Sequence, residues 1–241
     1  MQLSQNRDEF VTEHTGEVQR SSRLLFAITH DLAQPLHAAR LFSSALEGRI
    51  SDPKQQQMVD NIHASLEIAE QMLTEISLLG KLDAQSLPVE IEQVKVQEVI
   101  FDVISGYSPQ VQSQDNQIKY MPTKAVVQTD KVMLRRVLQR LVSNSLRFTK
   151  NGKILIGCRR FGDKLLLQVW DNGIGMDCSD EKDIFEEFIR LRNHDLYDQR
   201  CFGLGLAIVK RICSQIGAEI SFRSWSGNGS VFSVHLPCQG R

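Results

Sequence analysis

Apolar residues recur in alternating steps of three and four along the first third of the chain. The first series comprises Leu25, Ile28, Leu32, Pro35, Ala39, Phe42 and Leu46, and the second comprises Met58, Ile62, Ser65, Ala69, Met72, Ile76 and Leu79. This spacing forms a heptad seam and predicts two long helices that pack lengthwise. Gly48 is expected to end the first helix after Glu47, and Ser51-Asp52-Pro53 to start the second with a capping side chain before a first-turn proline.

Two long helices joined by a short turn form an antiparallel hairpin with one apolar stripe on each helix. A single hairpin buries such stripes poorly, so we predict that two copies pair into a dimeric four-helix bundle. The alternative is that both stripes cover the following domain, but a strict heptad period favours helix-on-helix packing. We assign residues 1–84 to this hairpin.

The heptad pattern stops between Leu82 and Glu90, and a second domain is expected over residues 90–241. Its predicted helices are Val94–Ile104, Asp130–Phe148 and Phe202–Ile216. Its extended segments are Gln117–Gln128, Lys153–Arg160, Lys164–Trp170, Glu219–Trp225 and Ser230–Leu236. Helices mixed with hairpin-linked strands predict an α+β sandwich. Trp170 and Trp225 fall in strand patterns and are therefore expected in its core.

Composition narrows the class of protein. The 241 residues carry a formal net charge of −1, which favours neither a nucleic-acid partner nor an anionic membrane surface. No apolar run reaches the roughly eighteen residues of a membrane helix, so we expect a soluble segment. The 5 cysteines are odd in number and widely spaced, which favours free thiols in a reducing cytoplasm.

His30 lies midway between two positions of the first seam, so its imidazole is predicted to face solvent. Asp31 is its neighbour, and Gln34 follows one helical turn later. Pro35 removes a backbone donor and is expected to kink or loosen the helix just beyond the histidine. An exposed histidine beside a carboxylate is a candidate phosphate acceptor or general base, although most surface histidines are only solvated side chains.

Three clusters in the second domain suggest chemistry. Asp171 follows a strand and precedes Gly173 and Gly175, a pattern in which a carboxylate accepts from an amino group while the backbone approaches a flat ligand. The run Gly203-Leu204-Gly205-Leu206 opens a helix, where free N–H groups attract phosphate. Asn144 suits Mg²⁺ through its amide oxygen, and Arg147 suits a phosphate. Taken singly, each cluster also reads as a turn, a tight corner or a solvated face.

Together these motifs resemble the catalytic core of the sensor histidine kinases of two-component signalling. His30 to Leu36 is similar to the H-box of that family, Leu141 to Thr149 to its N-box, and Asp171 to Gly175 to its G1 box. Ile184 to Phe188 is similar to the F-box, Phe202 to Lys210 to the G2 box, and Gly229 to Phe232 to the last glycine-containing segment. The order of these motifs is more specific than any one of them.

The resemblance implies a Bergerat-type ATP sandwich in which Asp171 binds adenine, Asn144 holds Mg²⁺ and Arg147 contacts phosphate. Further ATP-binding residues implied by the motifs are Gly173, Gly175, Phe188, Arg190, Gly203, Leu204, Gly205 and Leu206. A lid is implied over Met176 to Phe202. His30 would attack the γ-phosphate while Asp31 accepts its other ring N–H. Gln34 would place a water for dephosphorylation of the partner.

The implied partners are a second copy of the chain and the receiver domain of a response regulator. No receiver-like segment follows Phe232 and no sensor precedes residue 20, so both are expected on other chains or outside this segment. Three departures from the family pattern are Arg140 for asparagine, Cys201 for glycine, and Gln34 for threonine or asparagine. Arg140 and Cys201 leave open a weakly catalytic docking or phosphatase module. An ATP-gated clamp of the gyrase type would leave His30 unexplained.

Overall fold

The computed structural model describes residues 28–29, 31–46, 49–50, 52–107, 109, 111, 115–176, 183–189 and 202–237. The chain divides into two compact units, the first comprising Met1–Leu87 with Arg192–Leu204 and the second Pro88–Leu191 with Gly205–Arg241. None of the described helices combines the length and the apolar character that crossing a membrane requires.

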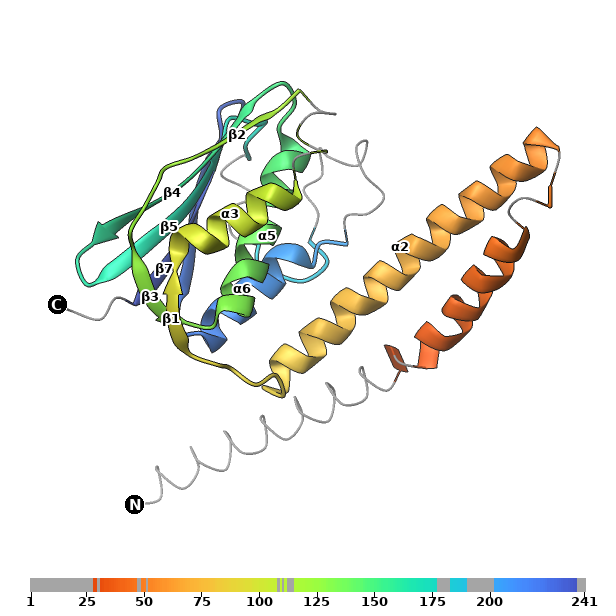
Figure 1. The fold of residues 1–241 in the computed structure, drawn as a ribbon, viewed down its shortest axis with the longest axis horizontal. Coiled ribbons are helices and arrows are strands. Elements are labelled where there is room, and N and C mark those ends of the chain that lie inside the picture. Colours follow the sequence, from red (N-terminus) through yellow and green to blue (C-terminus); the bar gives the residue numbers. More distant parts are fainter. Residues whose placement is uncertain are drawn as a thin grey trace, which may run out of the picture. The chain divides into compact units, whose positions relative to one another are not determined.

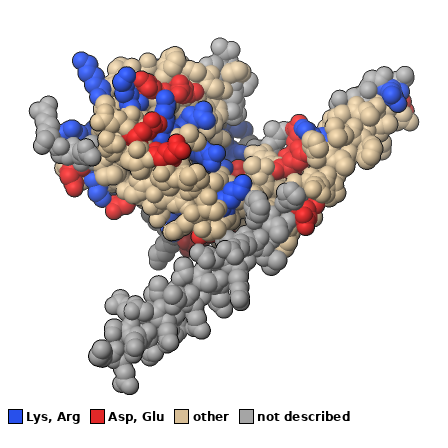
Figure 2. All heavy atoms as spheres, turned by 60° about the horizontal axis from the view of Figure 1, so that its bottom comes forward, with Lys and Arg blue, Asp and Glu red and all other residues tan. Residues whose placement is uncertain are grey.

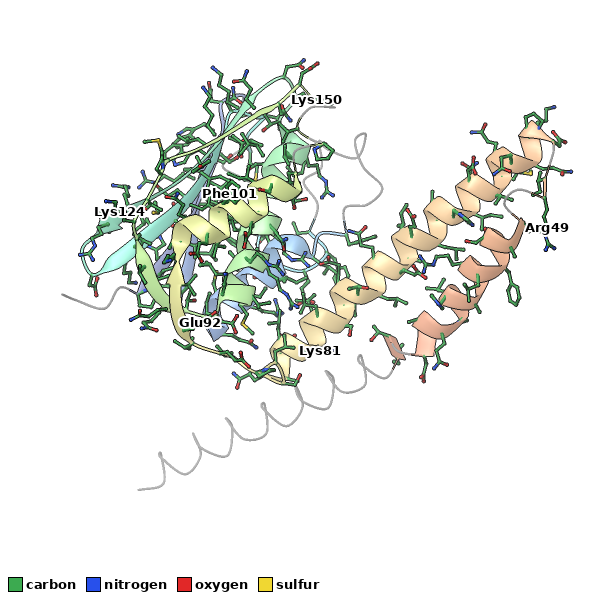
Figure 3. The ribbon with its side chains drawn as sticks, viewed as in Figure 1. Arg49, Lys81, Glu92, Phe101, Lys124 and Lys150 are labelled. Atoms are coloured by element: carbon green, nitrogen blue, oxygen red, sulfur yellow. The ribbon has the colours of Figure 1, made fainter. Side chains whose placement is uncertain are left out.

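The first unit contains an antiparallel helical hairpin (Figure 1). Residues 31–46 are helical, and α2 spans Pro53–Asp83. The carboxylate of Asp52 accepts from the Lys54 backbone N–H at 2.9 Å and caps α2, with proline in the first turn as the sequence indicates. Arg49 lies in the turn that joins the helices (Figure 3). The Arg40 guanidinium reaches Glu70 of α2, with 3.5 Å between Nε and Oε1.

Much of the two apolar stripes of this hairpin remains open to solvent in the single chain, although Leu79 at the end of the second stripe is buried. Leu32, Phe42 and Met58 are 49%, 75% and 65% exposed, although all three belong to the heptad seams. In Figure 2 most of the visible hairpin surface is neither basic nor acidic. One hairpin therefore leaves much of its seams uncovered, and the pairing of two hairpins into a four-helix bundle stays a prediction. Glu47 and Gly48, the expected end of the first helix, lie outside the described residues.

The second unit is built on a mixed sheet of five strands in the order β2-β4-β5-β7-β6. Its strands are β2 Gln117–Tyr120, β4 Lys153–Phe161, β5 Lys164–Asp171, β6 Glu219–Trp225 and β7 Gly229–Pro237. β2 pairs with β4 in parallel, and the other neighbours are antiparallel. A separate antiparallel pair joins β1 (Glu92–Lys95) to β3 (Val126–Thr129).

Helices α3 (Val96–Gly106), α5 (Lys131–Phe148) and α6 (Gly205–Gln215) cover one face of this sheet (Figure 1). Asp130 caps α5 by accepting from the Met133 backbone N–H at 2.9 Å. Alternate strand residues turn inward to meet the helices, and the largest fully buried side chains include Leu134, Leu138, Leu141, Ile154, Ile156, Leu167, Ile208 and Phe232. The helical region followed by an α/β sandwich confirms the predicted fold class.

In the second unit, the sequence reading is wrong about Val94 and about the two tryptophans. Val94 belongs to strand β1 and not to a helix, because it pairs with Val127 across the small sheet. Trp170 and Trp225 are 42% and 47% exposed and are not core residues. Both occupy alternate strand positions on the face of the sheet away from the helices, where side chains remain open to solvent.

Candidate functional site

The carboxylate of Asp171, the last residue of β5, is the centre of the candidate site. Its Oδ1 accepts from the backbone N–H of Gly173 at 3.0 Å and of Ser230 at 3.2 Å. Its Oδ2 accepts from the Ser145 hydroxyl at 3.1 Å. Burial raises the pKa of this carboxyl above its ordinary value, whereas the three hydrogen bonds act in the opposite direction. The end of β5, the start of β7 and the last turns of α5 thus meet at one acidic group.

Glycine is required beside this carboxylate for steric reasons. A Cβ atom at Gly173 would collide with the carbonyl oxygen of Phe148 on α5, and one at Gly175 with the carbonyl oxygen of Trp225. Gly175 also has a φ of +65°, which side-chain-bearing residues rarely adopt. In the structure, these glycines therefore allow the loop after β5 to approach the backbone of α5 and of β6 closely.

The turn between β6 and β7 holds the loop that follows Asp171. The backbone N–H of Gly227 donates to the Ile174 carbonyl at 2.7 Å, and that of Met176 donates to the Ser224 hydroxyl at 2.8 Å. From the other side, the Ile174 N–H donates to the Phe148 carbonyl at 3.2 Å. The loop is thus tied to a strand turn and to the end of α5, which suits a preformed ligand site.

Asn144 and Arg147 lie one turn apart on α5, and both side chains are half-buried. Asn144 immediately precedes Ser145, so its backbone lies beside the residue that bonds Asp171. The described part of the chain contains no cluster of three histidine, cysteine or acidic side chains able to hold a metal ion. A single amide oxygen nevertheless fits Mg²⁺ that is carried largely by substrate phosphates, since this ion commonly has few protein ligands.

The predicted phosphate-binding run stands at the start of α6. Gly205 is the first helical residue, so Gly203 and Leu204 precede the helix and Leu206 lies in its first turn. Gly203 has a φ of +70°, and Leu204 is fully buried. Helix α6 packs against α5 in the second unit (Figure 1). The sequence expectation of a helix from Phe202 therefore placed the helix start three residues early.

The segment 183–189 is anchored to α6 and β6. The Phe185 ring meets that of Phe222 edge-on, with 5.7 Å between centroids. Glu187 forms an ion pair with Arg211, and Glu186 one with Lys210 at 3.3 Å. Phe188 itself is exposed, with a φ of +61°. Arg190 and Cys201, together with most of the predicted lid, lie outside the described residues.

In the first unit, Asp31 and Gln34 are both exposed on the helix of residues 31–46. Their exposure to solvent agrees with the sequence prediction that this part of the helix surface faces away from the seam. His30, the predicted phosphate acceptor, lies outside the described residues. Arg140 lies on α5, near Tyr107. Burial raises the pKa of the half-buried Tyr107, whereas a hydrogen bond with Ser143 and the charge of Arg140 act in the opposite direction. The Tyr107 hydroxyl donates to the Gln139 carbonyl at 3.0 Å.

The sequence reading missed the serines of the site. Ser145 donates to Asp171, and Ser224 and Ser230 exchange a hydrogen bond of 2.8 Å at the strand turn that holds the loop. Ser145 stood within the motif quoted for Asn144, and its position on the same inward face as Leu138, Leu141 and Val142 was the signal that could have identified it.

Two family descriptions match the chain. The "His Kinase A (phospho-acceptor) domain" matches residues 20–85, which include the helical hairpin. The "Histidine kinase-, DNA gyrase B-, and HSP90-like ATPase" matches residues 129–240, which include Asn144, Asp171 and α6. Both matches fall where the corresponding motifs stand.

Individual relatives agree with these descriptions. An uncharacterized sensor-like histidine kinase of Rhizobium meliloti is 27% identical over 227 residues, and the alignment covers 90% of this chain and 42% of the relative. The chain thus spans less than half of that relative's length.

Solved structures show the same fold. Full-length ShkA in complex with AMPPNP has a TM-score of 0.72 at 22% identity, covering 89% of this chain and 45% of its own. Histidine kinase ThkA in complex with response regulator protein TrrA has a TM-score of 0.63 at 21% identity, covering 98% of this chain and 64% of its own.

Proposed function

We propose, from the premise that this chain belongs to the sensor histidine kinases of two-component signalling, that it transfers the γ-phosphoryl group of ATP to His30 and then to an aspartate of a response regulator. The observation that carries the proposal is the half-buried Asp171 carboxylate, held by backbone N–H groups at the end of β5 within the ATPase match. That group can accept a hydrogen bond from the amino group of adenine.

The remaining nucleotide contacts follow from the elements around Asp171. Arg147 on α5 would contact a phosphate, and the N-terminus of α6 would attract the phosphate chain with its free N–H groups. Asn144 would hold Mg²⁺ together with phosphate oxygens, and the ion would neutralise charge on the transferring group. The complex of ShkA with AMPPNP supports nucleotide binding by this fold.

In the proposed reaction, a neutral imidazole nitrogen of His30 attacks the γ-phosphorus in line, and the bond to the β-phosphate oxygen breaks with ADP as the leaving group. Asp31, next in the chain, would accept the other ring N–H and stabilise the positive charge that develops. Gln34, exposed on the same helix, would orient a water when the regulator is dephosphorylated. Unchanged phosphatase activity in Gln34→Ala would remove that role.

The partners and the domain limits belong to this proposal as well. The exposed heptad residues of the hairpin suit a second copy of the chain, giving a homodimer. The complex of ThkA with TrrA supports a response regulator as the phosphoryl acceptor. We assign phosphotransfer to residues 1–84 and ATP binding to residues 90–241, in the cytoplasm, where ATP is available.

Incubation with γ-labelled ATP and Mg²⁺ tests the proposal. The wild type is expected to gain acid-labile, base-stable label, which His30→Gln loses. His37→Gln is the matched control, because His37 is a second histidine nearby in the sequence, lies on the helix of residues 31–46 and contacts Glu70 at 3.8 Å. Label that persists in His30→Gln would refute His30 as the acceptor. Intact nucleotide binding without any label in the wild type would instead favour a docking or phosphatase module.

A further inference from the structure

Ser145 is an unusual residue for its position in the second unit. It lies on the inner face of α5 and is only 1% exposed, among the buried Leu141, Val142 and Leu146. A buried hydroxyl costs stability unless it is hydrogen-bonded. Its hydrogen bond goes to Oδ2 of Asp171 at 3.1 Å, from one element to another across 26 residues of sequence. Since an ionised carboxylate only accepts, the serine hydroxyl is the donor.

The hydrogen bonds of Asp171 determine which of its acceptor positions remain. A carboxylate offers about four lone-pair positions, two on each oxygen. Oδ1 accepts from the backbone N–H groups of Gly173 and Ser230. Oδ2 accepts from Ser145 among the described residues. One acceptor position on Oδ2 is left, and the three fixed donors prevent the carboxylate from rotating to present another.

We propose that Ser145 is a positioning residue for base specificity, which turns the remaining Oδ2 acceptor of Asp171 toward the exocyclic amino group of adenine. The inference rests on the proposed function and names the residue that makes its adenine contact selective. Adenine presents a donor at this position, whereas guanine presents a carbonyl oxygen, which a fixed acceptor repels. An unfixed carboxylate could turn away from that oxygen, so the serine bond is what enforces the preference.

The Ser145 hydroxyl is not needed for α5 to form. Alanine has the highest helix propensity and would occupy the same buried position without a polar group to satisfy. Removal of the hydroxyl should therefore leave the fold intact while it frees the carboxylate. The hydroxyl is thus expected to act through Asp171 and not on the ligand directly.

Equilibrium binding of two nucleotides by the full chain tests this role. ATP and purine riboside 5′-triphosphate differ only in the amino group that Asp171 is proposed to recognise. We expect Ser145→Ala to raise the Kd for ATP by about tenfold, as for a charge-assisted hydrogen bond that loses its geometry, and to leave the Kd for the purine analogue unchanged. The preference for ATP over GTP should fall in parallel. Ser145→Thr, which restores a hydroxyl, should recover ATP binding.

Ser233→Ala is the matched control, because it deletes a buried hydroxyl that accepts from the Gln168 side chain at 2.8 Å elsewhere in the same sheet. It should change neither Kd. An equal loss of affinity for both nucleotides in Ser145→Ala, or no loss for either, would overturn the inference. The proposed function would stand in that case, provided that the wild type binds ATP. A wild type that binds no ATP would overturn both.

Discussion

Gly227 in the β6–β7 turn and Gly229, the first residue of β7, separate two effects of glycine replacement. Both have a positive φ, +74° and +87°. A Cβ atom at Gly229 would collide with the carbonyl oxygen of Asp171, whereas one at Gly227 has no heavy atom within 4 Å. The two substitutions to alanine therefore share the backbone strain, and only Gly229→Ala adds a collision with the strand that ends in the proposed adenine-binding residue.

The structure determines how much more folding stability Gly229→Ala should lose than Gly227→Ala. An L-residue in the left-handed region costs about 1–2 kcal/mol, which is the whole effect expected for Gly227→Ala. Forcing extra volume against a packed backbone adds about 1–3 kcal/mol, so Gly229→Ala should lose about 2–5 kcal/mol in total. The carbonyl oxygen belongs to a central strand and cannot move aside as a flexible side chain would.

Urea denaturation of the two variants measures this difference directly. The midpoint for Gly229→Ala should lie clearly below that for Gly227→Ala at an unchanged denaturant slope, and its ATP affinity should fall because Asp171 is displaced. Equal losses of stability in the two variants would refute the argument, since they would leave backbone strain as the only operating term.

Three further outcomes follow from the described contacts. Burial raises the pKa of Asp171 above its ordinary value of 3.8, so ionisation of this carboxyl lowers the stability of the folded wild type. As pH rises from about 4 toward neutrality, thermal unfolding scans should therefore show Asp171→Asn gaining stability relative to the wild type. The same variant should lose ATP binding. In a double-mutant cycle the exposed pair of Glu186 and Lys210 should show less than about 1 kcal/mol of coupling. Phe42→Lys should yield monomers in light scattering, whereas Leu41→Lys, at a position that is also exposed but lies off the heptad seam, should leave a dimer.

Local signals in the sequence located most of the elements. Asp52 and Asp130 do cap α2 and α5, because capping depends on residues within a few positions of the helix start. Lys153–Phe161 and Lys164–Asp171 lie within one residue of their predicted ends, since alternation and the intervening turn define a hairpin locally. Features that a short window contains were thus predictable.

Features that depend on residues far apart in the sequence could not be predicted. Val94 sits in an apolar stretch that suits a helix or a strand equally, and its pairing with Val127 decides between them. Trp170 alternates correctly with inward residues, but alternation does not tell which face of a sheet the helices cover. The exposure of both tryptophans therefore followed from the arrangement of layers and not from the strand pattern.

Asp171 shows why the residue type of a site is easier to predict than the strength and orientation of the hydrogen bonds it can accept. Its position before Gly173 identified an acceptor, yet the strength and direction of that acceptor depend on burial opposed by three donors. Two donors are backbone N–H groups that persist under substitution as long as the glycines permit the close approach. Only the third, from Ser145, belongs to a side chain. A single substitution at that position can therefore change how the carboxylate is held while the fold that carries it stays the same.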